Sequence, residues 1–248
     1  MTRARWRALA VLIAVVLGAA ALALAARSPS PEQLPDRAPS ERPALLLLTS
    51  LPLVFGEQFS LEGGGSPALT ALEARYRVLP ISVTDPAELA KGALLMMAQP
   101  QAQPPENLVA LDRWVRGGGR VLLLADPLLE RPSERPLGDA LRPPPMFMDT
   151  GLLAHWGLRL DAPDERGAAV REVAGRRVQT VSPGALFGKC SVTKDRLIAR
   201  CQLGKGKAIV VADADLLGID HVKGATEANL DAINALLAEL EGDSLASR

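Results

Sequence analysis

Segment 104–127 constrains the fold more than any other, because it joins an amphipathic helix directly to a fully apolar strand. Apolar residues recur at three- and four-residue spacing over 108–115, which predicts one buried helical face. The three glycines at 117–119 supply the stop signal of that helix. The run 121–125 that follows shows no polar alternation. A strand of this kind is buried on both faces, which indicates a parallel sheet covered by helices.

The same alternation of apolar runs and helical segments extends over most of the chain. Further buried strands are predicted at 44–49, 77–83, 93–98 and 208–212. Helices are predicted from Pro67, with Ser66 as its cap, from Asp85-Pro86, over 150–156, with Asp149 as its cap, and from Ala225. Short β-rich runs between 170 and 202 predict antiparallel strands. The fold class is therefore predicted as α/β: a mostly parallel, doubly wound sheet with antiparallel strands near the C-terminal end.

The N-terminus predicts a membrane anchor. Residues 8–26 carry no charge and follow three arginines, and about 20 apolar residues cross a bilayer as a helix. The arginines favour a cytoplasmic N-terminus and an exported remainder. We therefore expect a single-pass protein of the inner (cytoplasmic) membrane with its globular part on the periplasmic side. A cleaved signal peptide is the alternative.

The predicted organisation has five parts. They are a basic stub at 1–7, a transmembrane anchor at 8–26, a proline-rich linker at 27–43, an α/β domain at 44–241 and a polar tail at 242–248. Within the domain, the proline-rich segment 128–148 has no periodicity. We expect it to be a lid or partner-contact loop, or else a passive insertion.

Charge and cysteine usage narrow the class of protein further. Lysine and arginine together number 28, as do aspartate and glutamate, so no nucleic-acid partner is expected. If residues 195–196 form a hairpin turn, Cys190 and Cys201 face each other on antiparallel strands. The sequence predicts a disulfide between them, as suits an exported domain. Two reduced, packed cysteines are the alternative.

Candidate site residues are the polar side chains that follow the predicted strands, because ligands bind beyond the carboxyl ends of an open parallel sheet. They are Thr49, Ser50, Gln99, Asp126, Asp213 and Asp215. The alternative is that these aspartates cap turns. The chain shows no nucleophile elbow, dinucleotide fingerprint, phosphate-loop lysine or zinc-helix motif. No catalytic residue, metal site or cofactor is therefore expected.

Several of these motifs together resemble a known family. They are Gln99-Pro100 after a strand, Trp114-Val115 before the glycines, Asp126-Pro127-Leu128, and the late run GKGKAIVVADAD at 204–215. This order is similar to the exported domain of auxiliary subunits of gliding-motility-type ABC transporters and related membrane-tethered proteins. The resemblance implies a class I glutamine amidotransferase-like fold. It also implies partnership with the permease and ATPase subunits of an ABC transporter.

Glutaminases of that fold carry a cysteine on a strand-to-helix elbow and a late His-x-Glu pair. Gln99 follows the corresponding strand here, and Lys223 stands two residues after His221. The predicted function is therefore a membrane-anchored, non-catalytic accessory or binding domain associated with an ABC-type transport or envelope complex. The alternative is an exported hydrolase or ligand-binding sensor that uses the strand-end carboxylates.

Overall fold

The computed structural model describes residues 33–54, 66–136, 138–218 and 226–242. Its compact unit begins at Leu34, ahead of the predicted boundary at 44. Arg37 explains the difference: its guanidinium forms a 2.9 Å ion pair with Glu241 and lies 5.3 Å from the ring centroid of Tyr76. The predicted anchor at 8–26 lies outside the described residues. None of the helices within those residues has the length and apolarity to span a bilayer.

A mixed, largely parallel sheet forms the centre of the described part of the chain. Its seven strands run in the order β2-β1-β3-β4-β11-β10-β9. The parallel strands are β1 (Ala44–Thr49), β2 (Arg77–Pro80), β3 (Leu94–Ala98), β4 (Arg120–Leu124) and β11 (Gly206–Val211). All five residues of β3 are buried. The predicted α/β class with a mostly parallel sheet is confirmed.

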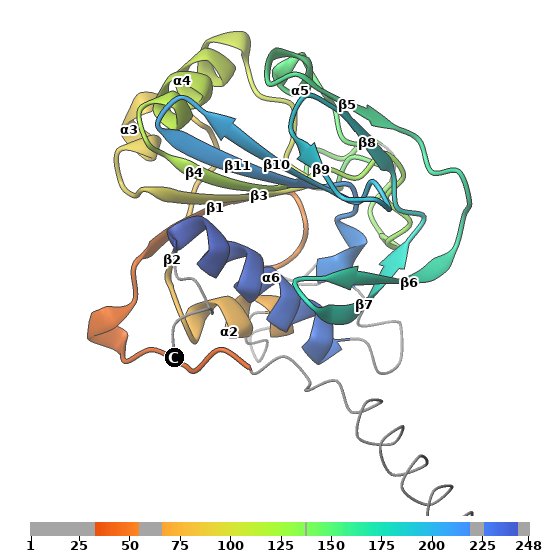
Figure 1. The fold of residues 1–248 in the computed structure, drawn as a ribbon, viewed down its shortest axis with the longest axis horizontal. Coiled ribbons are helices and arrows are strands. Elements are labelled where there is room, and N and C mark those ends of the chain that lie inside the picture. Colours follow the sequence, from red (N-terminus) through yellow and green to blue (C-terminus); the bar gives the residue numbers. More distant parts are fainter. Residues whose placement is uncertain (1–32, 55–65, 137, 219–225, 243–248) are drawn as a thin grey trace, which may run out of the picture. The chain divides into compact units, whose positions relative to one another are not determined.

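Helices cover both faces of this sheet. Figure 1 shows α3 (Pro86–Leu89) and α4 (Pro105–Arg116) on one face, and α2 (Pro67–Glu73) and α6 (Thr226–Glu241) on the other. The predicted Ser66 cap is present, because its Oγ accepts from the Leu69 amide at 3.1 Å. Asp85 caps α3 in the same way, with Oδ1 accepting from the Glu88 amide at 2.8 Å. Short 3₁₀ turns lie at Pro39–Glu41 and Asp215–Leu217.

Antiparallel strands lie toward the C-terminal end, as predicted. β10 (Ile198–Leu203) pairs antiparallel with β11 and with β9 (Ser191–Val192). Two small sheets pair β5 (Leu158–Asp161) with β8 (Ala185–Gly188), and β6 (Ala168–Val173) with β7 (Arg176–Val181). The sequence analysis did not anticipate β8.

Two predicted boundaries were wrong. The strand expected at 77–83 ends at Pro80, and the next amide, that of Ile81, still bonds to the Leu47 carbonyl at 2.9 Å. The helix expected from residue 150 is α5 (Leu152–His155). Asp149 delays its start, because Oδ1 accepts from the amides of Gly151 (3.0 Å) and Leu153 (3.2 Å).

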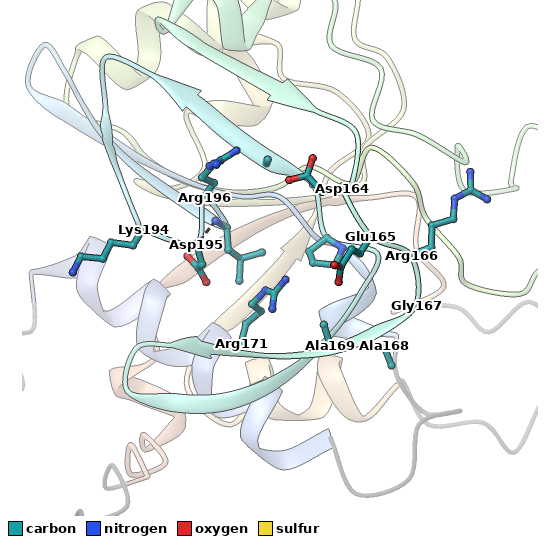
Figure 2. Close-up of a pocket in the computed structure, with 14 residues that line it drawn as sticks. Asp164, Glu165, Arg166, Gly167, Ala168, Ala169, Arg171, Lys194, Asp195 and Arg196 are labelled. Carbon is teal, nitrogen blue, oxygen red and sulfur yellow. Dashed lines mark hydrogen bonds between the residues drawn. The ribbon is translucent and has the colours of Figure 1, made fainter.

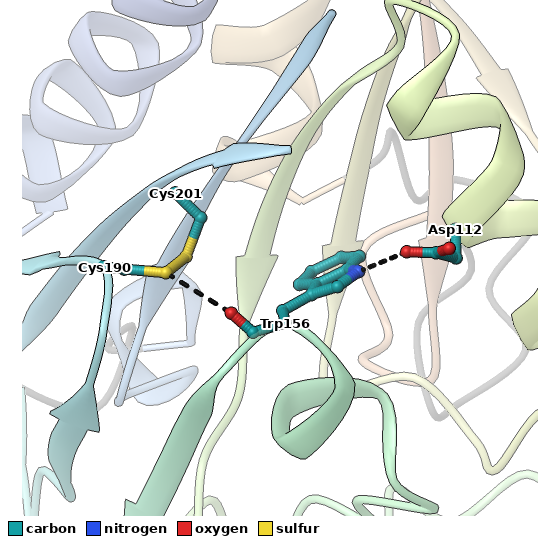
Figure 3. Close-up of a disulfide and its surroundings, with 4 residues drawn as sticks. All are labelled: Asp112, Trp156, Cys190 and Cys201. Atoms are coloured by element: carbon teal, nitrogen blue, oxygen red, sulfur yellow. Dashed lines mark hydrogen bonds between the residues drawn. A yellow bond between two sulfur atoms is a disulfide. The ribbon is translucent and has the colours of Figure 1, made fainter. Parts of the chain in front are cut away.

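The predicted disulfide is present. Cys190 and Cys201 are bonded, with their Cα atoms 4.8 Å apart, and the flanking pairs 191–200 and 192–199 have the expected register. Figure 3 shows the bridge beside Trp156, whose carbonyl oxygen lies 3.7 Å from Cys190 Sγ. The Trp156 indole donates to Asp112 Oδ1 on α4 at 3.1 Å. The bridge therefore lies next to the contact between α5 and α4.

Candidate carboxyl-edge site

The six predicted site residues all lie at one edge of the sheet. Thr49 is the last residue of β1 and Ser50 follows it; Gln99 follows β3, Asp126 follows β4, and Asp213 and Asp215 follow β11. Parallel strands bring these ends together, as the sequence predicted. Their environments divide the edge into two halves. One half, above β4 and β11, is closed and acidic, and the other, above β1 to β3, is open and mainly apolar.

Asp126, Asp213 and Asp215, which we call the acidic cluster, fill the closed half. Their exposed fractions are 0%, 0% and 1%. Asp126 accepts from the amides of Leu128 (2.8 Å) and Ala214 (3.0 Å). Asp213 accepts from the amides of Val181 (2.9 Å) and Leu216 (3.0 Å). These carboxylates therefore tie β7, β11, the turn after β11 and the start of the proline-rich loop together.

Asp215 extends the cluster to two residues that the sequence analysis did not find. Its Oδ2 accepts from the Glu130 amide at 3.0 Å. The Glu130 carboxylate in turn accepts from Ser182 Oγ at 2.6 Å, and Ser182 Oγ accepts from the Gly167 amide at 2.8 Å. Ser182 is fully buried with φ of 47°. No sequence motif marks Ser182 or Glu130, because neither follows a strand of the main sheet.

Burial shifts the titration of the acidic cluster. Loss of solvation raises the pKa of Asp126 to about 7, against the opposing amide hydrogen bonds and with help from the nearby Asp215 charge. Burial also raises the pKa of Asp213 well above its ordinary value, and Asp126 and Asp215 push in the same direction. Asp126 and Asp213 therefore favour retention of their protons near neutral pH.

Gln99 joins the two halves. Its side chain is fully buried and its φ is 43°, a region that costs a non-glycine residue free energy. Oε1 accepts from the Asp126 amide at 3.0 Å, and Nε2 donates to the carbonyls of Asp126 (3.2 Å) and Pro144 (3.0 Å). Gln99 therefore fastens the far end of the proline-rich loop to the ends of β3 and β4.

The hydroxyls of Thr49 and Ser50 also face inward. Thr49 Oγ1 donates to the Ala98 carbonyl at 2.8 Å and accepts from the Leu51 amide at 2.9 Å. Ser50 Oγ donates to the Gln99 carbonyl. These residues hold the end of β1 against the end of β3, as the backbone of a tight turn requires.

The open half contains a cavity of about 580 Å³, which we call the edge cavity. Its lining comes from the ends of β1 and β2, the segment after β3 and the proline-rich loop. It comprises Leu47, Leu48, Thr49, Ser50, Leu51, Pro52, Val54, Pro80, Ile81, Ser82, Gln101, Gln103, Arg135, Ala140 and Leu141. β1 and β3 are neighbours in the sheet, but the helices that follow them, α2 and α4, cover opposite faces (Figure 1). The cavity lies at this point, which is the usual ligand position of an open α/β sheet. Its size is typical of ligand sites.

A second hollow, of about 370 Å³, lies between the β6–β7 hairpin and the β9–β10 turn. Charged side chains dominate it. Figure 2 shows Arg171 pointing into it between Asp195 and Glu165, while Lys194 points away. Asp195 is already engaged, because Oδ1 accepts from Thr193 Oγ1 at 2.6 Å. We assign no ligand to this hollow.

Among the described residues, metal-ligating side chains are not grouped, and His155 lies at the surface. Within them, no three His, Cys, Asp or Glu side chains are grouped to hold a metal ion. His155 is exposed, and its Nε2 lies 3.3 Å from Asp112 Oδ2. Burial raises the pKa of Asp112, but hydrogen bonds from Arg116 and Trp156 outweigh it, so the pKa is lowered overall. His221 lies outside the described residues.

Comparison with known proteins places the fold but no family. No protein-family model matches the chain, and no curated protein matches it. Among solved structures, it is similar to the mmIFT52 N-terminal domain, with 13% identity, a TM-score of 0.51, and 79% of this chain and 97% of that one covered. It is also similar to the cytoplasmic protein STM3548 from Salmonella typhimurium, with 11% identity, a TM-score of 0.50, and 80% and 98% covered.

Glycoside hydrolases also appear among the similar structures. The exo-β-1,4-mannosidase Op5Man5 from Opitutaceae bacterium strain TAV5 is 12% identical with a TM-score of 0.49, over 79% of this chain. The chain spans only 36% of the length of that enzyme. At these identities the likenesses concern the fold alone, so they transfer no activity to this chain.

Proposed function

We propose that this chain is a non-catalytic binding domain, held at the inner membrane, that works with an ABC-type transport or envelope complex. One observation carries the binding function. The polar side chains at the strand ends are used in internal hydrogen bonds, whereas the edge cavity beside them is open and mostly apolar. An arrangement of this kind suits recognition of a ligand better than chemical conversion of one.

The residue that follows β3 supports this proposal. In the class I glutamine amidotransferase-like fold that the sequence resemblance implies, the nucleophile would follow the strand that is β3 here. Gln99 occupies that position with a positive φ. However, its amide is committed to three hydrogen bonds. This side chain therefore fastens a loop and has no role as a nucleophile.

The disulfide supports export of the domain. Bridges such as Cys190–Cys201 persist in oxidising compartments and are rare in the cytosol of most organisms. Together with the predicted anchor at 8–26, the bridge favours a periplasmic location for the domain. Association with permease and ATPase subunits follows from the sequence resemblance and from the tethered arrangement.

The test of this function uses the intact chain in its membrane. Crosslinking in cells followed by detergent extraction and affinity purification should recover integral membrane subunits with an ATPase. A variant with residues 8–26 replaced by a cleavable signal peptide is the matched control, and it should lose most of this recovery. Recovery of the intact chain from the soluble cytosol, with both cysteines reactive toward a thiol reagent, would contradict the proposal.

A hydrolase that uses Asp126 is the second candidate, because a pKa of about 7 is suited to general acid–base catalysis. That role requires the loop after β4 to open, since Asp126 is fully buried. Asp126→Asn should then abolish hydrolysis of any substrate that the protein turns over, whereas Asp164→Asn on the protein surface should not. Equal turnover by both variants and the unmodified protein would eliminate this candidate.

A further inference from the structure

The edge cavity has an uneven distribution of charge. Of the described residues that line it, Arg135 alone carries a formal charge. The deeper walls come from buried residues of the sheet edge, including Leu47, Leu48 and Ile81, with exposed fractions of 1%, 4% and 8%. The cavity therefore offers an apolar body with a single positive group.

The polar side chains of the lining offer few hydrogen bonds to a ligand. Gln103 Oε1 accepts from the Thr84 amide, and its Nε2 donates to the Gln101 carbonyl, both at 3.2 Å. Gln101 Nε2 donates to the Arg142 carbonyl at 3.2 Å. Thr49 and Ser50 are directed into the protein, as described above. A strongly hydroxylated ligand would therefore leave most of its own polar groups unpaired, which is costly.

Arg135 lies on the proline-rich loop and lines one side of the cavity, together with Ala140 and Leu141. Its Nη1 is 3.6 Å from Asp139 Oδ2, and both side chains are about a quarter to a third exposed. An ion pair this long and this accessible contributes little free energy. An anionic group that brings its own apolar tail can compete with the partners that Arg135 already has, Asp139 among them.

We propose that the edge cavity binds a single-chain anionic amphiphile, with its acyl chain along Leu48, Ile81 and Leu141 and its head group at Arg135. This inference rests on the proposed binding function, because it names the ligand of the same cavity. The head group is a carboxylate or a phosphate, supplied by a free fatty acid or by a lysophospholipid. Leu141 lines the cavity and is 68% exposed, so an acyl chain in the cavity would cover an apolar side chain that otherwise faces solvent.

Photocrosslinking of the full-length chain in lipid nanodiscs tests the proposal directly. Two probes are used in parallel, a fatty acid and a lysophospholipid, each with a diazirine in its acyl chain. Peptide mapping by mass spectrometry should find label in 47–54, 80–82 or 140–141. The probe that labels these segments identifies the source of the head group. Label in the predicted anchor at 8–26 reports ordinary contact with the bilayer and serves as an internal standard.

Three variants make the test specific. Arg135→Gln should lower cavity labelling at least fivefold relative to the anchor, whereas Arg113→Gln, the same change on the exposed face of α4, should leave it unchanged. Ser82→Trp should block the cavity from its exposed side. If that variant unfolds on heating much earlier than the unmodified chain, Leu141→Asp takes its place, because Leu141 is a surface residue.

Competition defines the chemistry of the ligand. Dodecanoate should displace the fatty-acid probe, and lengthening the competitor by one methylene should improve displacement up to roughly fourfold until the cavity is filled. Dodecyltrimethylammonium should compete at least tenfold less well. Equal competition by the two head groups, or unchanged labelling in Arg135→Gln, overturns the proposal.

Absence of any label in the cavity segments also overturns it. The proposed function is scored separately, by recovery of membrane partners with unmodified protein. If the unmodified protein recovers its membrane partners but shows no label in the cavity segments, only the proposed ligand is refuted. If the cavity is labelled but no membrane partner is recovered, the proposed assembly role is refuted.

Discussion

The two halves of the carboxyl edge are built from the same kind of strand end, yet they differ in what lies above the strands. Above β4 and β11, three carboxylates are covered by loops and accept hydrogen bonds from backbone amides. Above β1 to β3, the space remains open as the edge cavity. The closed half fixes the loops, and the open half is available to a ligand. Polar residues at strand ends therefore mark the scaffold of this site rather than its contact surface.

The difference between the closed and open halves predicts, as its largest effect, that stability depends on pH through the acidic cluster. Asp126 has a folded pKa of about 7 against 3.8 for the free group. The folded state therefore keeps a proton that the unfolded state releases between these values. Through Asp126 alone, stability should fall by roughly 4 kcal/mol as pH rises from about 4 to about 7. Asp213, whose pKa is also raised, should add a fall in the same direction. Chemical denaturation at several pH values measures this profile.

Asp126→Asn is the variant that checks the assignment, since the amide does not titrate. Its stability should change less over the same pH interval, because Asp126 no longer contributes to the profile. A profile for the unmodified protein that rises from pH 4 to pH 7 would show that the acidic cluster is ionised throughout and that the closed half is held differently.

Removal of a cluster carboxylate should also have a large effect. Asp213→Ala leaves the buried amides of Val181 and Leu216 without their acceptors, at a cost of roughly 3 kcal/mol. Asp164→Ala, on the surface, should change the free energy of unfolding by less than about 0.5 kcal/mol. Thermal unfolding followed by circular dichroism compares the two. Similar values for both would contradict a structural role for Asp213.

The disulfide should contribute somewhat less. It closes a loop with a sequence separation of 11 residues, for which loop entropy predicts about 2–3 kcal/mol. The double replacement Cys190→Ala with Cys201→Ala should lower stability by this amount without altering the pH profile of the closed half. Identical unfolding midpoints in oxidised and reduced protein would show that the bridge contributes nothing.

Gln99→Ala tests the connection between the halves and should have the smallest effect, about 2 kcal/mol. The change removes both donations and one acceptance that fasten the loop at Pro144 and Asp126. Hydrogen exchange should increase at the Leu129 and Phe147 amides, which close that loop. Gln202→Ala, which removes an exposed glutamine on β10 away from this loop, is the control. Unchanged exchange in Gln99→Ala would mean that the loop is held by its backbone bonds alone.

Much of the fold was predictable because its strongest signals are local. Uniformly apolar runs identified β1, β3, β4 and β11, and the caps Ser66 and Asp85 fixed two helix starts. β8 was missed because its four residues carry no alternation and follow a proline and a glycine. The partner of each strand in the small sheets depends on tertiary packing, which periodicity does not encode.

The site was predicted in position but not in role. The parallel sheet itself guarantees that Thr49, Gln99 and Asp126 converge, so their proximity followed from the strand order. Whether they face solvent depends on the proline-rich loop and on β7, which approach from distant parts of the chain. Ser182 and Glu130 meet only through that approach. The apolar lining of the edge cavity was indistinguishable in sequence from ordinary core.

The ends of the main sheet limit how this domain can meet its neighbours. One border is β2, four residues long and finished by Pro80, and the other is β9, only two residues long and adjoining the cysteine bridge. Edge strands as short as these are poor templates for pairing with a strand of another chain, which protects the protein against edge-to-edge aggregation. Any companion protein is thus expected to dock through side chains and loops instead of extending the sheet.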